Sequence, residues 1–199
     1  MTNTTCLAVI DTSIGTLVLH AEGEYLTRIE LPTPARVATA RDGDATNVLH
    51  DAATQLTQYL AGERLSFDVP VRLNGTHFQR AVWGELMKIP YGETITYSDL
   101  AHRVDSPKGF RAVGQANGRN PIPIIVPCHR VVASNGIGGY AGGVNMKLTL
   151  LELEQQVTTR GVSISSSVHG RHSASATLDS RCTNQYRGGI VRRTYEPVS

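Results

Sequence analysis

The chain has 199 residues, of which 40% are hydrophobic and 18% are charged. These values are typical of a folded chain that buries a substantial core, in one domain or in two small ones. No apolar run approaches the roughly 20 residues needed to cross a bilayer. The first residues also lack the basic and apolar regions of a signal peptide. We therefore expect neither membrane insertion nor export.

The cysteines give information about the redox environment. There are three of them, Cys6, Cys128 and Cys182, and they are widely spaced. An odd number without any close pair argues against a disulfide framework and against a cysteine-rich zinc site. We expect a reducing compartment, which is the cytoplasm or, in a nucleated host, the nucleus, and no bound metal.

Charge is distributed unevenly along the chain. Residues 1–71 have four arginines against nine acidic residues, a net charge of −5. Residues 72–130 have eight basic against four acidic residues, and residues 131–199 have seven against four. A basic middle after an acidic start is compatible with a polyanionic partner. On charge alone, an ordinary charged surface is the favoured explanation of the pattern.

Residues 1–73 are expected to form a small α+β lobe. Three β-branched, apolar stretches, 6–10, 15–20 and 25–31, are separated by turn sequences and predict strands. Apolar side chains recur at helical spacing over 49–60, and Gly62 is placed to end that helix. Alternation of apolar residues at Leu65, Phe67, Val69 and Val71 predicts one more strand. We find no catalytic group of residues in this lobe.

Residues 74–154 are expected to be mainly helical. Phe78, Val82, Leu86 and Ile89 share one helical face, and the sequence at 90–92 ends that helix. A capping-box pattern at 96–99 starts a second helix, and a loop over 105–109 leads into a third over 111–117. Two short helices joined by a tight turn are typical of a helix-turn-helix. Helical hairpins are also common in proteins that bind no DNA.

The last segment, 155–199, changes in composition. It is rich in serine, threonine, glycine and arginine, and its apolar residues follow no sustained period. Such a segment buries too little surface to offset chain entropy. We expect a disordered tail, with a basic arm that contacts phosphates, or an extension without function, as the less favoured alternatives.

The segment from Asn120 to Val132 contains the most informative chemistry. Its prolines and β-branched residues predict extended backbone leading into a largely buried, rigidly held Cys128. A buried cysteine is usually inert, and reactivity requires a lowered thiol pKa or a nearby base. His129 is the candidate base, although neighbours on an extended chain point to opposite faces. A bridging water or a sharp turn after Cys128 would bring them together, and Glu154 is the candidate to orient the imidazole.

Several motifs occur together and in a fixed order. They are Tyr97 in the capping helix, Arg111 opening the next helix, Asn120-Pro121-x-Pro123, Pro127-Cys128-His129-Arg130, the glycine-rich loop 136–143 and Leu150-Leu151-x-x-Glu154. This set resembles the O6-alkylguanine-DNA alkyltransferase family over about residues 6–154. The resemblance implies an α+β fold: a small N-terminal sheet and helix lobe (1–73), then a mainly helical DNA-binding domain with a helix-turn-helix (74–154).

The resemblance also implies an activity, the single-turnover transfer of an alkyl group from O6 of guanine, with repair of O4-alkylthymine left open. Cys128 corresponds to the alkyl acceptor, His129 to its base and Glu154 to the carboxylate that orients the base. Asn120 corresponds to the residue that braces the turn, and Tyr97 to one that assists base rotation and proton donation. No cofactor is needed, because the lesion supplies the alkyl group.

The implied partner is double-stranded DNA that contains alkylated guanine, bound by a monomer, with cooperative binding left open. Arg111 corresponds to the finger that replaces the flipped nucleotide. The expected DNA-binding set is completed by Gly114, Ala116, Asn117 and Arg119 on the second helix. The expected substrate pocket contains Tyr97, Val131, Tyr140, Ala141 and Gly142.

This sequence departs from the family pattern in three places, of which one is a tail beyond Gln155 that is longer than the family core requires, and three rival functions are open. Ala141 stands where some relatives have serine, which bears on the range of adducts accepted, and no cysteine–histidine set like the zinc site of some relatives occurs near the N-terminus. A non-catalytic lesion binder is the first rival, but relatives of that kind lack the cysteine that Cys128 provides. A Cys-His-Glu hydrolase is the second, and a helix-turn-helix transcription regulator is the third.

Overall fold

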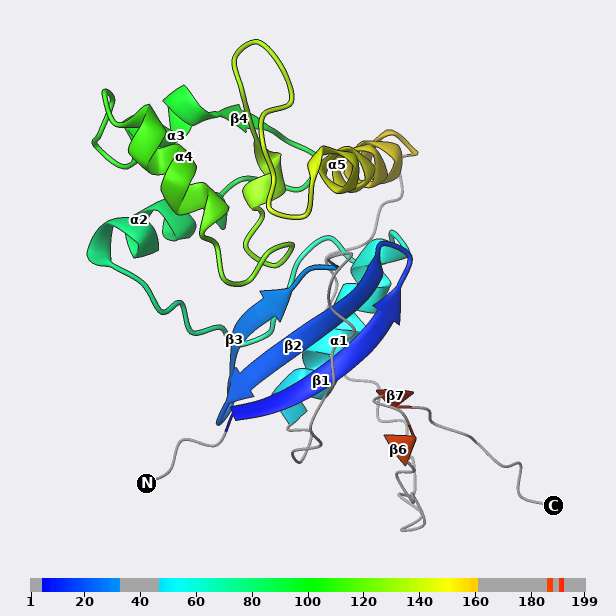
Figure 1. The fold of residues 1–199 in the computed structure, drawn as a ribbon. Helices are drawn as coiled ribbons and strands as arrows, with labels where there is room; N and C mark the ends of the chain where they lie inside the picture. Colours follow the sequence, from blue (N-terminus) through cyan, green and yellow to red (C-terminus); the bar gives the residue numbers. More distant parts are fainter. Residues whose placement is uncertain (1–4, 33–46, 161–185, 188–189, 192–199) are drawn as a thin grey trace, which may run out of the picture.

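The computed structural model describes residues 5–32, 47–160, 186–187 and 190–191. Figure 1 shows a small sheet backed by a helix, with a group of helices and loops beyond one end of it. We call residues 5–73 the N-terminal lobe and residues 77–160 the helical lobe. The elements are β1 (Thr5–Thr12), β2 (Gly15–Glu22), β3 (Tyr25–Glu30), α1 (Asn47–Leu60), α2 (His77–Leu86), β4 (Ile95–Thr96), α3 (Tyr97–Arg103), α4 (Phe110–Gly118), the 3-10 turn η1 (Cys128–Arg130), β5 (Val131–Val132), α5 (Val144–Thr159), β6 (Tyr186–Arg187) and β7 (Ile190–Val191).

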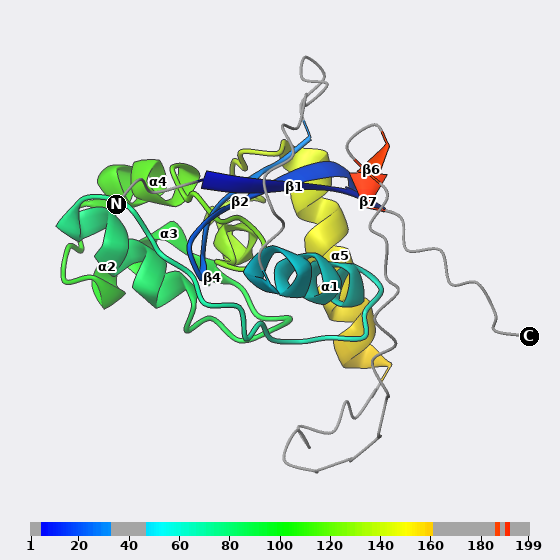
Figure 2. The same ribbon diagram turned by 90° about the horizontal axis from the view of Figure 1, so that it is seen from below.

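The N-terminal lobe contains the three predicted strands and the predicted helix. Strands β1, β2 and β3 form one antiparallel sheet in that order, and α1 covers one of its faces (Figures 1 and 2). The apolar face of α1 includes Leu49, Leu56 and Tyr59, all fully buried. Gly62, just beyond α1, has a positive φ of 76°, as expected of a residue that ends a helix.

The predicted fourth strand is wrong. Residues 65–71 do alternate between more and less buried positions, but only Val71 forms a bridge, parallel to Leu26. Backbone hydrogen bonds join Leu26 to the flanking residues Pro70 and Arg72. Alternation therefore indicates which side chains face the core, and a single bridge is too little to make a strand.

The helical lobe follows the predicted order of helices. Side chains of Thr76 and Thr96 cap α2 and α3, and each completes a capping box with the residue three positions on. Helices α3 and α4 are the predicted helix pair, joined by residues 104–109. Trp83 of α2 supports this pair, because its indole N–H donates to the Ala116 carbonyl at 2.8 Å.

The two lobes share one hydrophobic core. A single cluster of buried side chains includes residues of the sheet, of α1 and of the helical lobe. A backbone hydrogen bond from Ile29 to the Pro121 carbonyl, 2.9 Å long, joins β3 to the segment that precedes Cys128. The N-terminal lobe is thus fixed against the segment that contains the candidate nucleophile.

The predicted start of the tail is also corrected. Helix α5 extends to Thr159, and Val157 is buried in it, so residues 155–159 belong to the folded part. Beyond residue 160 the structure describes only the short antiparallel pair β6 and β7, and the rest of the predicted tail, with Cys182, lies outside the described residues. None of the described helices is long and apolar enough to cross a membrane.

Candidate active site

The chain enters Cys128 through a tight turn, so the predicted extended backbone is wrong. The amide of Val126 donates to the Ile122 carbonyl at 2.9 Å, and Ile124 has a φ of 76°. A positive φ is unusual for a β-branched residue and is tolerated only where the surroundings enforce it. Ile124 is fully buried, which is consistent with such enforcement.

Asn120 holds this turn together and also reaches the sulfur. Its side-chain oxygen accepts from the Ile122 amide at 3.0 Å. Its Nδ2 donates to the Val126 carbonyl at 2.7 Å and lies 3.0 Å from the Cys128 Sγ. One side chain therefore satisfies both ends of the turn and directs an N–H at the sulfur, which explains why local extended propensity is overridden.

A sharp turn follows Cys128, which is one of the two arrangements that could bring the sulfur and the imidazole together. Residues Cys128–Arg130 form the 3-10 turn η1, and β5 then pairs in parallel with β4. Cys128 is only 3% exposed, and His129 is fully buried. The imidazole Nδ1 has no hydrogen-bond partner among the described residues, which leaves it available to accept a proton.

The Glu154 carboxylate is the centre of the buried network. Its Oε1 accepts from His129 Nε2 at 2.9 Å and from Arg130 Nη2 at 2.9 Å. Its Oε2 accepts from Arg130 Nε at 3.0 Å and from the Gly92 amide at 2.9 Å. Gly92 has a φ of 79°, and an added Cβ would lie 2.6 Å from Thr158 Oγ1, so only glycine fits this donor position.

The N-terminal lobe contributes Tyr59 to the same network. The Tyr59 hydroxyl donates a short hydrogen bond to Glu154 Oε1, and it lies 3.3 Å from His129 Nε2. Tyr59 is fully buried at the end of α1. The carboxylate is therefore held by groups from both lobes.

These contacts set the protonation states. Burial raises the pKa of the Glu154 carboxyl, but hydrogen bonds from His129 and Arg130 outweigh that effect and hold its pKa at about 2. Burial lowers the pKa of His129, and its hydrogen bond to Glu154 opposes that shift without cancelling it. The imidazole is thus neutral at pH 7. Its proton is on Nε2, facing an ionised carboxylate, and Nδ1 is the free base.

The thiol itself is not pre-ionised. Burial raises the pKa of Cys128 to about 11, against the lowering effects of the Asn120 hydrogen bond, nearby backbone amides and Lys147. At neutral pH the resting sulfur is therefore protonated. Reaction requires a base that removes the proton as the sulfur attacks.

Cys128 lines a pocket of about 300 Å³. Tyr97 of α3 and Tyr140 of the 133–143 loop line it, together with Asn117. Burial raises the pKa of both tyrosines, so their hydroxyls stay protonated and can donate. The full lining is Tyr97, Gly114, Asn117, Gly118, Cys128, Gly139, Tyr140 and Ala141.

Lys147 fixes the loop that walls this pocket. Its ammonium group is buried, and it donates to the Val131 carbonyl at 2.6 Å and to the Gly139 carbonyl at 3.2 Å. The Tyr97 hydroxyl also donates to the Gly139 carbonyl, at 3.4 Å. Gly139 is therefore held from α5 and from α3, and the pocket wall is tied to the strand that follows Cys128.

The predicted site residues fall into different places. Arg111 is exposed on α4, and Gly114 lines the pocket. Ala116 and Asn117 are only 3% and 4% exposed, and their place in the expected DNA-binding set stays a prediction. Asn117 also lines the pocket, and its Nδ2 donates to the Cys128 carbonyl at 3.4 Å.

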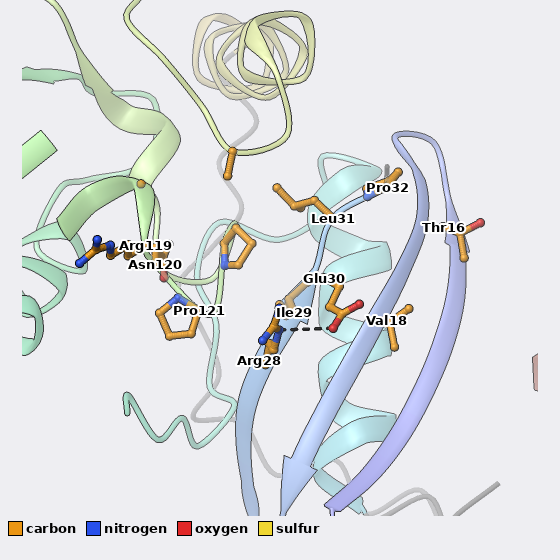
Figure 3. A pocket seen from close by; sticks show the side chains of 13 residues that line it. Thr16, Val18, Arg28, Ile29, Glu30, Leu31, Pro32, Arg119, Asn120 and Pro121 are labelled. Atoms are coloured by element: carbon orange, nitrogen blue, oxygen red, sulfur yellow. Dashed lines mark ion pairs between the residues drawn. The ribbon is translucent and has the colours of Figure 1, made fainter. Parts of the chain in front are cut away.

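Two residues of the expected substrate pocket, Val131 and Gly142, do not line it. Val131 is fully buried, and its carbonyl already accepts from Lys147. Arg119 lies beside the pocket, in a cleft between the lobes that Figure 3 shows. Ala141 lines both hollows.

Sequence reasoning missed Tyr59, Arg130 and Lys147 as members of the site. Tyr59 occurs on the apolar face of its helix, a pattern that predicts a core residue and gives no partner for the hydroxyl. Lys147 shares an inward helical face with Leu150, Leu151 and Glu154, and that spacing is a signal that could have identified it. A polar residue on a buried helical face requires a hydrogen-bond partner. The position of Lys147 on this face therefore indicates a buried contact of its ammonium group.

The fold and the site define a class of protein: a helix-turn-helix protein with a cysteine that lines a pocket and is followed by a histidine held by a buried glutamate. No group of three or more metal-ligating side chains occurs among residues 5–32 and 47–160.

Comparison with known proteins agrees with this class. The family model of the ribonuclease-like domain of 6-O-methylguanine DNA methyltransferase matches residues 6–73, and the model of its DNA-binding domain matches residues 77–156. A methylated-DNA–protein-cysteine methyltransferase of Mycobacterium leprae is 47% identical over 156 residues, which are 75% of this chain and 93% of that protein. One of Methanosarcina acetivorans is 44% identical over 150 residues, covering 74% and 96%.

Solved structures are similar too. The crystal structure of a Mycobacterium tuberculosis protein in complex with DNA is 43% identical, covers 76% of this chain and 93% of its own, and has a TM-score of 0.70. The O6-methylguanine DNA methyltransferase of Methanococcus jannaschii is 30% identical with a TM-score of 0.55, covering 74% and 92%. The chain belongs to the 6-O-methylguanine DNA methyltransferase family.

The first prediction concerns the buried carboxylate. In Glu154→Gln the Arg130 charge loses its partner inside the core, so we expect the free energy of unfolding to fall by about 3–5 kcal/mol. Urea unfolding at pH 7 measures it, with Glu152→Gln, exposed on the same helix, as the control. The folded pKa of Glu154 lies below the unfolded value of about 4.3. The difference in the free energy of unfolding between wild type and Glu154→Gln should therefore be complete above a pH of about 4.3 and shrink as the pH falls toward 2. A difference that stays constant across this pH range would contradict the assigned pKa.

The second prediction concerns the resting thiol. Because the pKa of Cys128 is about 11, its labelling by iodoacetamide should accelerate about tenfold per pH unit from pH 7 to pH 10. Mass spectrometry of the Cys128 peptide measures the rate, and free cysteine, which levels off near a pKa of about 8.5, is the control. A plateau below pH 9 at Cys128 would show a pre-formed thiolate and contradict the assignment.

Proposed function

We propose that this protein repairs alkylated DNA by transferring an alkyl group from O6 of guanine to Cys128, once per molecule. The observation that carries the proposal is that Cys128 lines a pocket and is followed by His129, whose neutral imidazole is oriented by an ionised carboxylate. Membership in the 6-O-methylguanine DNA methyltransferase family supports it. The names of the relatives describe the same transfer to a protein cysteine.

The reaction balances without a cofactor. His129 Nδ1 removes the thiol proton through a bridging water, and the sulfur attacks the alkyl carbon in line with the departing O6. The S–C bond forms, the C–O6 bond breaks, guanine takes up a proton from the Tyr97 hydroxyl, and the proton held by His129 then returns to Tyr97 through water. Glu154 stabilises the imidazolium that forms. The product is a thioether, which has no leaving route, so each molecule acts once.

The raised thiol pKa suits a protein that reacts only once. A pre-formed thiolate would react with adventitious electrophiles and waste the molecule. Because the resting sulfur is protonated, the thiolate forms only as the sulfur attacks a substrate in the pocket. Asn120 and the backbone amides beside the sulfur then stabilise the developing charge.

Helices α3 and α4 are proposed to bind the duplex. The target base is inaccessible in stacked DNA, so the nucleotide must be flipped out, at a cost of a few kcal/mol. Arg111 is exposed at the start of α4 and is proposed to occupy the vacated space. Phe110 beside it is 51% exposed, and its ring lies 5.9 Å from the Arg111 guanidinium. An apolar side chain at this place favours an unstacked base step.

Asn117 is proposed to help distinguish guanine. Its amide nitrogen faces the Cys128 carbonyl, and its Oδ1 has no hydrogen-bond partner among the described residues. An alkyl group on O6 removes the N1 proton, so the 2-amino group is the remaining N–H donor on that edge of the base. A base without the 2-amino group would leave the buried Asn117 oxygen without a donor, which disfavours binding of that base.

One experiment tests the proposed function. The full chain is incubated with a duplex that contains a single O6-methylguanine, and its intact mass is recorded with time. We expect a stoichiometric gain of one methyl group at Cys128, with none in Cys128→Ala. Lesion binding without a mass change would instead identify a non-catalytic binder, and would overturn the proposal.

A further prediction tests Asn117. We expect wild-type protein to react about tenfold or more slowly with O6-methylhypoxanthine, which lacks the 2-amino group, than with O6-methylguanine in the same duplex. Asn117→Leu should reduce this ratio toward one, because it removes the acceptor while keeping the volume similar. An unchanged ratio in Asn117→Leu would assign recognition of the amino group to the backbone alone.

A further inference from the structure

A second hollow lies beside the pocket, and transfer of a methyl group does not use it. The inter-lobe cleft has a volume of about 440 Å³. Figure 3 shows it between strands β2 and β3 on one side and the segment of Arg119, Asn120 and Pro121 on the other. The backbone hydrogen bond from Ile29 to the Pro121 carbonyl, 2.9 Å long, spans the two sides. The cleft is therefore a fixed feature of the fold.

The cleft and the pocket meet at Gly118 and Ala141, which line both. Neither residue has side-chain atoms beyond Cβ, so the boundary is formed by the two smallest residue types. Asn120 also lines the cleft, and its Nδ2 lies 3.0 Å from the Cys128 Sγ. A group attached to the sulfur is thus a single residue away from the cleft.

The wall of the cleft is chemically suited to a hydrocarbon. Many of its side chains are apolar, namely Val18, Ile29, Leu31, Pro32, Pro121 and Pro123. Two of its charged groups, Arg28 and Glu30, pair with each other at 3.4 Å, as the dashed line in Figure 3 marks. Such a surface favours an aliphatic chain or an aromatic ring, because apolar area leaves water on binding.

We propose that the inter-lobe cleft binds the distal part of a long O6-alkyl group, which passes over Gly118 and Ala141 while its first carbon lies at Cys128. This inference rests on the proposed function. The bonds that form and break are the same as for a methyl group, and the rest of the chain stays in the cleft as part of the thioether. The N-terminal lobe thereby determines the largest adduct that the protein accepts.

Kinetics on two substrates test this role. Val18 lies on β2 in the cleft wall, and Val9 is its partner on β1, on the same sheet face but outside the cleft. Val18→Phe should leave transfer from O6-methylguanine near the wild-type rate, and should slow transfer from O6-(4-phenylbutyl)guanine by at least about tenfold. Val9→Phe, the matched control, should slow neither. Equal effects of Val18→Phe on both substrates, or no effect on either, would overturn the proposal.

A crosslinking measurement on the wild-type chain removes any dependence on how Val18→Phe folds. The protein is loaded from a duplex whose O6-alkyl chain ends in a diazirine, irradiated, and mapped by mass spectrometry. Crosslinks to residues 16–32 are expected, and crosslinks confined to α3, α4 or residues 134–140 would contradict the cleft. If the wild type takes no methyl group from O6-methylguanine, the proposed function fails first, so the two failures are distinguishable.

Discussion

The structure of the site depends on one buried carboxylate. Glu154 is fully buried in α5, and it accepts hydrogen bonds from Tyr59, His129, Arg130 and the Gly92 amide. An unpaired carboxylate in such a place is unfavourable by several kcal/mol, so the burial of Glu154 depends on these donors. They come from α1, from the turn after α2 and from η1. The carboxylate that orients the base therefore also joins the two lobes, through its contact with Tyr59.

Local sequence patterns predicted most of the helices and strands. They failed where hydrogen bonds from side chains determine the backbone conformation. The three strands, the helix over 49–60 and the α3–α4 pair followed from periodicity and capping, which are properties of neighbours in sequence. The extended path into Cys128 was wrong because Asn120 bonds both ends of a turn. The contact between Tyr59 and Glu154 joins residues 95 positions apart, and no local pattern encodes such a pair. The family resemblance identified Cys128, His129 and Glu154, but it did not identify Tyr59 or Lys147.

The same framework explains why the N-terminal lobe belongs to the working unit. It contributes the Tyr59 hydroxyl to the carboxylate, and its sheet forms one wall of the cleft beside the sulfur. The helical lobe contributes the cysteine, the imidazole and the helix pair. Lys147 and Tyr97 then hold Gly139, so the loop that walls the pocket is fixed before any substrate arrives. Such preorganisation lowers the entropic cost of placing a substrate against Cys128.

The chemistry of the site requires His129 to be a neutral base with its proton on Nε2, directed at an ionised Glu154. Nitrogen-15 NMR of the labelled imidazole measures both properties directly. Between pH 6 and pH 8 we expect a protonated Nε2 that couples to one hydrogen, and a Nδ1 shift typical of an unprotonated nitrogen. An imidazolium at pH 7, or a neutral ring with its proton on Nδ1, would leave Cys128 without a base and contradict the account.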